Sequence, residues 1–220
     1  LIKFFIKSSI GLVNFKLYNK SKISSVSKIT LIDSFIDAGN LNKESIDRNY
    51  TGISNFLNDD ESKNIYFLPS FLGLLYPSRV KTVRNKSKLK VLFKTNFLKF
   101  SDYLKAFSLI KRNNFHFKNN FLGNINIDYI LEKIHSLNKY DNSTFDAILN
   151  YLFIKNLHND KIKIKLFISW FENQQIDKGY IYGLRRFYPQ TKIKGYQGFI
   201  VSYDYNIQLI PTSFEIENNL

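Results

Sequence analysis

A group of polar side chains follows the most apolar run of the chain. Glu172, Asn173 and Gln174 come directly after the run 162–170, which alternates apolar and basic residues and then becomes wholly apolar. That pattern predicts a strand that enters a buried sheet. In open parallel sheets ligands bind beyond the carboxyl ends of the strands, where a carboxylate can act as a general base or orient a sugar hydroxyl. We therefore predict that Glu172 is catalytic and that the two amide residues bind substrate.

Two charged residues, Asp177 and Lys178, stand in the first turn of the helix expected next. The free N–H groups of a helix start can hold a phosphate, so both residues are predicted to bind substrate. An acid at a helix start also caps the helix and complements its dipole. A purely structural role is therefore the alternative for Glu172 and for Asp177.

The next expected strand, 191–199, also ends in polar residues. If the two strands are parallel neighbours, their carboxyl ends meet at one edge of the sheet and share one crevice. We predict that Tyr196, Gln197 and Gly198 bind substrate in that crevice.

Weaker candidates lie elsewhere. Asp33 and Asp37, near the end of another expected strand, reach the same edge in this fold, although loop carboxylates are more often solvated. The histidines His116, His135 and His158 lie in different segments without the spacing of metal ligands, so no metal site is expected. No motif indicates a bound cofactor.

The elements that must position these residues are strands and helices in alternation. Strands are expected at 28–36, 64–69, 89–94, 162–170 and 191–199, and helices at 45–57, 101–112, 127–137, 143–157 and 179–188. This pattern predicts an α/β fold with a Rossmann-like open, mainly parallel sheet flanked by helices. Residues 1–27 are expected to be an N-terminal helix or linking segment, and residues 28–220 the α/β domain.

Three local details follow from the same patterns. Pro69 is expected to close the second strand, since it cannot donate to a sheet ladder. Ser101 is expected to cap the helix 101–112. The apolar stripe of the helix 143–157 is expected to belong to the core, and it consists of Phe145, Ile148, Leu149, Leu152 and Phe153.

The composition restricts the function classes. The net charge is +14, but it comes mainly from Lys, and Lys, Asn, Ile and Phe are abundant together, which is typical of AT-rich coding. No Arg-rich stripe appears, so nucleic acid is not an expected partner. There is no Cys, which excludes disulfides, and no uninterrupted apolar run has the length of a spanning helix. These features favour a cytoplasmic protein, and the N-terminal LIKFFIKSSI would suit peripheral contact with the inner membrane face.

The chain contains no Met and opens directly on an apolar segment. We therefore expect it to be a fragment of a longer protein.

The segment 169–202, SWFENQQIDKGYIYGLRRFYPQTKIKGYQGFIVS, followed by PTSFE at 211–215, resembles a block of bacterial surface-polysaccharide biosynthesis proteins related to GT-B glycosyltransferases. The shared pattern is an aromatic residue and Glu at a strand end, a helix that includes an Arg, then Pro, then a strand ending in Gly-Tyr-Gln. Many members of the family carry Pro-Trp or an acid after the Glu, where this chain has Asn173, and His after Gly-Tyr-Gln, where it has Gly198.

The resemblance implies one half of a GT-B-like architecture, with a second Rossmann-like domain beyond Leu220 that binds most of the sugar nucleotide. This chain would then be the acceptor-side domain of a glycosyltransferase-like protein, inactive alone. Its partners would be a sugar nucleotide donor and a carbohydrate or lipid-linked acceptor. The alternative is a non-catalytic interaction domain of an envelope-carbohydrate assembly system.

Overall fold

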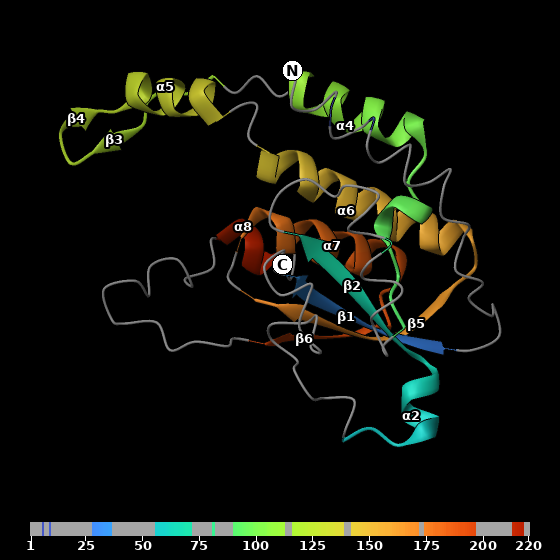
Figure 1. Ribbon diagram of the computed structural model, residues 1–220. Helices are drawn as coiled ribbons and strands as arrows, with labels where there is room; N and C mark the ends of the chain where they lie inside the picture. Colours follow the sequence, from blue (N-terminus) through green and yellow to red (C-terminus); the bar gives the residue numbers. More distant parts are fainter. Residues whose placement is uncertain are drawn as a thin grey trace.

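The structure is a computed structural model, and it describes part of the chain. The described residues are 28–36, 56–71, 90–112, 116–138, 142–171, 174–196 and 213–217, together with the single residues 6, 9 and 81. The elements that Figure 1 labels are β1 (Lys28–Ile36), α2 (Asp59–Lys63), β2 (Ile65–Phe71), α4 (Phe100–Arg112), β3 (Phe121–Leu122), β4 (Ile125–Asn126), α5 (Asp128–Asn138), α6 (Asn142–Asn159), β5 (Lys163–Trp170), α7 (Gln175–Phe187), β6 (Lys192–Tyr196) and α8 (Ser213–Glu217). A short 3₁₀ helix, η3 (Lys94–Asn96), precedes α4.

The main sheet has four parallel strands in the order β2-β1-β5-β6. Long apolar runs suit strands that are covered by other elements, and a right-handed helical crossover is the usual way to join parallel neighbours. The helix α7 makes such a connection between β5 and β6. The α/β class and the Rossmann-like open sheet predicted from the sequence are therefore confirmed.

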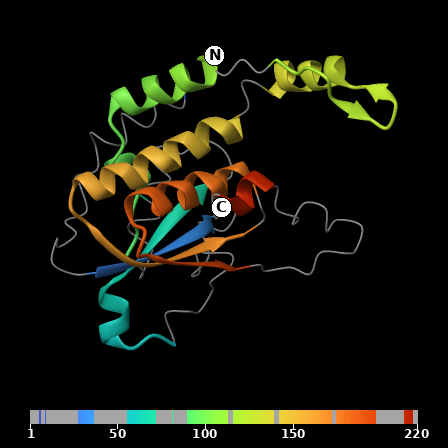
Figure 2. The ribbon, with the colours of Figure 1, turned by 180° about the vertical axis from the view of Figure 1, so that it is seen from behind.

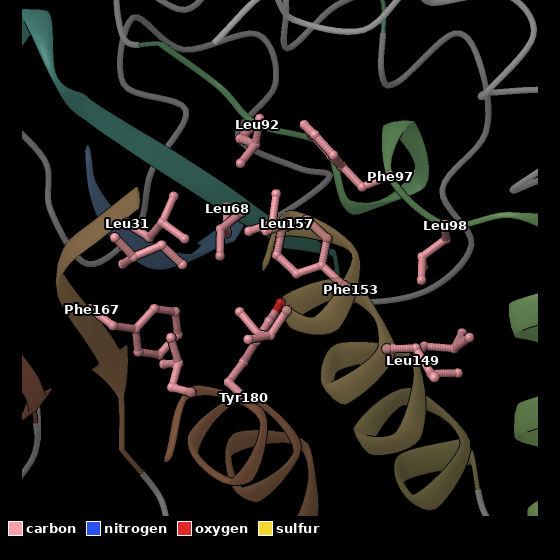
Figure 3. Close-up of a cluster of buried hydrophobic side chains, with 14 of the residues drawn as sticks. Leu31, Leu68, Leu92, Phe97, Leu98, Leu149, Phe153, Leu157, Phe167 and Tyr180 are labelled. Carbon is pink, nitrogen blue, oxygen red and sulfur yellow. The ribbon is translucent and has the colours of Figure 1, made fainter. Parts of the chain in front are cut away.

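One face of the sheet is covered by α7 and α6, and α4 packs against α6 on the side away from α7, as both views show (Figures 1 and 2). The helix α6 is apolar on most of its surface because it packs against both α4 and α7. Its predicted stripe does belong to the core: Phe145, Leu149, Leu152 and Phe153 are buried, and Ile148 packs against them half-buried. Figure 3 shows the centre of this core, where Tyr180 of α7 contacts both Phe153 of α6 and Phe167 of β5.

The second strand continues through Pro69, contrary to expectation. Pro69 lies inside β2, where it is paired with Ser34 of β1, and β2 ends at Phe71. Among the named strands, β2 lies at the edge of the sheet, where a residue without an N–H group can be accommodated. The prediction failed because strand order is not visible in the local sequence.

Two other local expectations were wrong. The strand expected at 89–94 is reduced to one bridge, between Val91 and Phe67. The helix α4 begins at Phe100, so Ser101 lies inside it; the backbone N–H of Lys99 donates instead to the carboxylate of Asp102, at 2.7 Å. Asp102, three residues after Lys99, thus makes the reciprocal half of a capping box, in which an acid of the first turn accepts from the backbone N–H of the residue before the helix.

The other expected helices and strands that fall on described residues agree with the sequence patterns to within a few residues. The structure adds α2, the hairpin β3–β4 and α8, which were not predicted. The helix α7 starts one turn before the expected 179–188, and β6 covers the first part of 191–199. The helix expected at 45–57 lies outside the described residues except at its last positions, where residues 56–57 are not helical. The segment 1–27 also lies outside them, apart from residues 6 and 9.

Candidate functional site at the carboxyl edge of the sheet

The strand order places a topological switch point between β1 and β5. The chain leaves β1 toward β2 on one side, and it leaves β5 toward β6 on the other. At such a point the two connections diverge, and ligands of open α/β sheets bind in the crevice that results. The helices α6 and α7 run parallel, and both begin near this edge. Their first turns are in contact, since the hydroxyl of Thr144 in α6 donates to the side chain of Gln175 in α7 at 2.9 Å.

A carboxylate stands beside the switch point. Asp33 lies two residues after the core residue Leu31 in β1, so its side chain points to the helix-covered face of the sheet. It is only 2% exposed, and its Oδ1 accepts a hydrogen bond from the hydroxyl of Ser70 in β2 at 3.0 Å. Asp33 lies inside the strand expected at 28–36, and it is buried rather than solvated, contrary to the alternative for loop carboxylates. Asp37 lies outside the described residues.

Tyr180 of α7 is fully buried next to this carboxylate. Burial raises the pKa of Tyr180 well above its ordinary value, and the charges of Asp33, Asp146 and Asp177 raise it further. The nearby hydroxyl of Ser70 acts in the opposite direction and lowers the pKa of Tyr180. That hydroxyl, however, donates its hydrogen bond to Asp33. In the part of the chain described, no group meets the Tyr180 hydroxyl at good hydrogen-bond geometry. Tyr180 therefore keeps its proton at any physiological pH.

A lysine enters the same region from the 3₁₀ helix η3, which precedes α4. The ammonium of Lys94 donates to Oδ1 of Asn150 in α6 at 2.7 Å and lies 5.4 Å from the centre of the Tyr180 ring. The amide of Asn150 in turn donates to the carbonyl of Ile176 in α7, at 3.0 Å. Lys94 is thus held between α6 and α7. We call Asp33, Ser70, Lys94, Asp146, Asn150, Asp177 and Tyr180 the rim cluster.

Asp177 and Lys178 lie in the first turn of α7, as expected. Asp177 accepts a hydrogen bond from the backbone N–H of Gln174 at 3.1 Å, so it does cap α7, as the structural alternative supposed. Lys178 forms an ion pair with the buried carboxylate of Glu215 in α8. Gln174 is exposed at the start of the helix.

The ends of β5 and β6 lie side by side, as predicted. Trp170 and Tyr196 are paired in register with ring centres 5.5 Å apart, and the N–H of Phe171 donates to the carbonyl of Tyr196 at 2.9 Å. Four other predicted site residues lie outside the described residues, so their predictions stay untested: Glu172, Asn173, Gln197 and Gly198.

The chemistry of the rim cluster suits hydroxyl groups. Carboxylate and amide oxygens accept hydrogen bonds from hydroxyls, and an ammonium group donates to their oxygens. Asp146, Ser70 and Lys94 are half-buried and so keep part of their surface at the edge of the cluster. Within the described ranges, no three His, Cys, Asp or Glu side chains are grouped so that they could hold a metal ion.

Sequence reasoning missed five members of the rim cluster, Ser70, Lys94, Asp146, Asn150 and Tyr180. Asn150 carried a usable signal, because it interrupts an otherwise apolar stretch of α6 and a buried polar group requires partners. Lys94 carried none, since an isolated lysine in a lysine-rich chain is indistinguishable from a surface residue.

Comparison of the chain with known protein families, with curated proteins and with solved structures finds no match. No helix among the described residues is both long and apolar enough to cross a membrane.

Proposed function

We propose that this chain is the acceptor-side domain of a glycosyltransferase-like protein that builds bacterial surface polysaccharide. Glu172 serves as the base or acceptor-orienting carboxylate, and the substrate also contacts Gln174, Lys178 and Tyr196. The donor is a sugar nucleotide, and the acceptor is a carbohydrate or a lipid-linked carbohydrate.

One observation carries the proposal: the switch point of the parallel sheet is flanked by polar groups on both sides. Asp33 lies at the β1 side, and the chain that joins Phe171 to Gln174 at the β5 side includes Glu172. In this proposal Glu172 orients a hydroxyl-rich acceptor at this edge and accepts its proton. Asp33 is only 2% exposed and supports the edge from within.

An ion pair joins the two parts of the segment that resembles the polysaccharide-biosynthesis family, residues 169–202 and 211–215. Lys178 belongs to the first part, and Glu215 belongs to the short segment PTSFE that follows it. Their ion pair brings α8 against the first turn of α7. Residues that are separate in the sequence thus converge at the same edge of the sheet.

The test is calorimetric titration of the complete protein that contains this chain with a panel of sugar nucleotides, combined with an assay of sugar transfer. The variant Glu172→Gln should reduce transfer by about 10²–10⁴-fold, the usual contribution of a general base. The matched control is Asp59→Asn on the exposed surface of α2, which should transfer normally. Retained transfer in Glu172→Gln would remove the catalytic role of Glu172, and a folded protein that binds no sugar nucleotide would reject the transferase function.

A second candidate function is a non-catalytic interaction domain of an envelope-carbohydrate assembly system. One observation favours it: the segment 116–138 exposes many apolar side chains away from the sheet. A complete protein that binds a partner through this segment and binds no sugar nucleotide would favour this second function.

A further inference from the structure

The segment 116–138 forms an arm that extends from the body of the molecule. It consists of the hairpin β3–β4 and the helix α5, which lie beyond the end of α6 in both views (Figures 1 and 2). Among the described elements, neither the hairpin nor α5 packs extensively against the sheet or against α4, α6 and α7. The arm therefore owes its shape to interactions within itself.

Hydrogen bonds to one carboxylate join the parts of the arm at its root. The carboxylate of Asp128 accepts hydrogen bonds from the backbone N–H groups of Asn119 and Asn120, at 3.0 and 2.9 Å, and from the side-chain amides of Asn120 and Asn126, at 2.8 and 3.1 Å. The N–H of Ile127 donates to the carbonyl of Asn120 at 2.9 Å. These bonds join the hairpin to the first turn of α5.

The arm buries very little of its own apolar surface. Leu122 and Ile125 at the hairpin are 71% and 66% exposed, and Tyr129 and Leu137 on α5 are 76% and 73% exposed. The other large exposed apolar side chains of the arm are Phe121, Ile130 and Ile134. A contiguous apolar patch larger than about 300–600 Å² is unusual on a free monomer and marks an interaction site.

The outer face of α4 adds to this surface. The helices α4 and α5 both lie along the upper edge of the molecule in Figures 1 and 2. The exposed residues of α4 include Leu104 and Leu109 together with Lys105 and Lys111. Apolar side chains mixed with lysines on an exposed helix face suit the boundary of an anionic bilayer.

The charges of this surface indicate the kind of partner. Exposed lysines occur on both parts, and they are Lys99, Lys105, Lys111, Lys118 and Lys133. The described acids of the arm and of α4 are fewer: they are Asp102, Asp128 and Glu132, against these five lysines. The surface is therefore positive as well as apolar, in a chain whose net charge is +14.

We propose that the hairpin, α5 and the outer face of α4 dock on a membrane that contains anionic lipid, with the hairpin inserted into the boundary between head groups and acyl chains. A second copy of the chain is a poor occupant, because an isologous dimer would place two positive surfaces against each other. A bilayer supplies both an apolar phase and negative head groups. This docking does not depend on the proposed carbohydrate function.

The test uses flotation of the full chain with vesicles of zwitterionic phospholipid alone or mixed with anionic phospholipid. The chain should float only with the anionic vesicles. The double variant Leu122→Ser with Ile125→Ser should weaken this binding by about tenfold or more, because it removes the apolar groups that insert. The matched control is Phe56→Ser, which changes a side chain that is 87% exposed beside α2 and should bind as the native chain does.

The absence of Cys allows a second measurement. A polarity-sensitive dye attached at Leu122→Cys should report an apolar environment with anionic vesicles, and the same dye at Phe56→Cys should not. Failure of the native chain to float would overturn the proposal, as would equal flotation of the double variant, which would assign binding to overall charge. A native chain that self-associates through Leu122 and Ile125 in the absence of lipid would assign the surface to a second copy instead.

Discussion

Gly179 of α7 lies directly against the backbone of Ala147 in α6. A Cβ atom added to Gly179 would lie 2.7 Å from the carbonyl carbon of Ala147 and 2.8 Å from its Cα atom. Only a glycine permits the two helices to approach this closely. The contact matters for the site, because α6 and α7 together hold Lys94 and Tyr180 in the rim cluster.

Gly179→Ala should therefore lower the free energy of unfolding by about 3 kcal/mol or more, since backbone atoms cannot move aside as side chains do. The control is Gly183→Ala on the same face of α7, where the nearest atom is Cβ of Ile154 at 3.0 Å. There the higher helix propensity of Ala, about 1 kcal/mol, offsets the tight contact. Urea unfolding of both variants is the measurement, and equal losses would show that the helices are free to separate.

Buried tyrosines should make the fold sensitive to alkaline pH. Burial raises the pKa values of Tyr103, Tyr180 and Tyr188 above the ordinary value. Above about pH 10 the unfolded chain releases these protons and the folded chain retains them, so the stability that is present below pH 10 is lost as the pH rises. Each group contributes up to about 1.4 kcal/mol per pH unit to this loss.

Tyr180→Phe should reduce that slope by the share of one group and change the free energy of unfolding at neutral pH by less than about 1 kcal/mol, because the hydroxyl has no well-aligned partner among the described groups. The exposed residue Tyr129 is the control, and Tyr129→Phe should leave the slope unchanged. Urea unfolding at a series of pH values between neutrality and pH 11 gives the comparison. A large loss of stability in Tyr180→Phe at neutral pH would instead show that its hydroxyl is bonded.

Asp128 should control the order of the arm without controlling the global fold. Hydrogen bonds from Asn120, and then from Asn126 and Asn119, lower the pKa of its carboxyl. The stabilisation is thus present above the unfolded pKa of about 3.9 and is lost as the pH falls through the lower folded value. Asp128→Ala should speed amide hydrogen exchange at Asn119 and Asn120 while exchange in β1 stays slow. The control Glu132→Gln should change neither, and unchanged exchange at Asn119 in Asp128→Ala would contradict the role of the carboxylate.

Lys178 and Glu215 should be energetically coupled. The carboxylate of Glu215 is buried and the ammonium of Lys178 is about one-third exposed. A double-mutant cycle with Lys178→Ala and Glu215→Gln should give a coupling free energy of about 1–3 kcal/mol, which is typical of hydrogen bonds to charged groups. The same cycle with Glu217→Gln, on the exposed side of α8, should give less than about 0.5 kcal/mol. Equal values would show that α8 does not depend on this pair.

The sequence by itself determined the local elements, because their signals are local. The β-branched run at 28–36 became β1 with the expected bounds, and the apolar stripe from Phe145 to Phe153 was buried as expected. A period of two or of 3.6 residues depends only on neighbouring positions. The parallel arrangement of β5 and β6 also followed, since a short strand–helix–strand connection leaves few other choices.

Only the tertiary structure decided the composition of the site. Asp33, Ser70, Lys94, Asn150 and Tyr180 come from five separate segments, and their meeting depends on the strand order β2-β1-β5-β6. Long-range order also explains why the end of the second strand was misplaced, since Pro69 is accommodated in a strand that lies at the edge of the sheet. The burial of Asp33 likewise depends on packing, because the buried Tyr180 of α7 lies next to it. The exposure of the arm was equally invisible, because its apolar residues have the spacing of an ordinary core helix and hairpin. Whether such residues are buried depends on what packs against them, and that is a property of the whole fold.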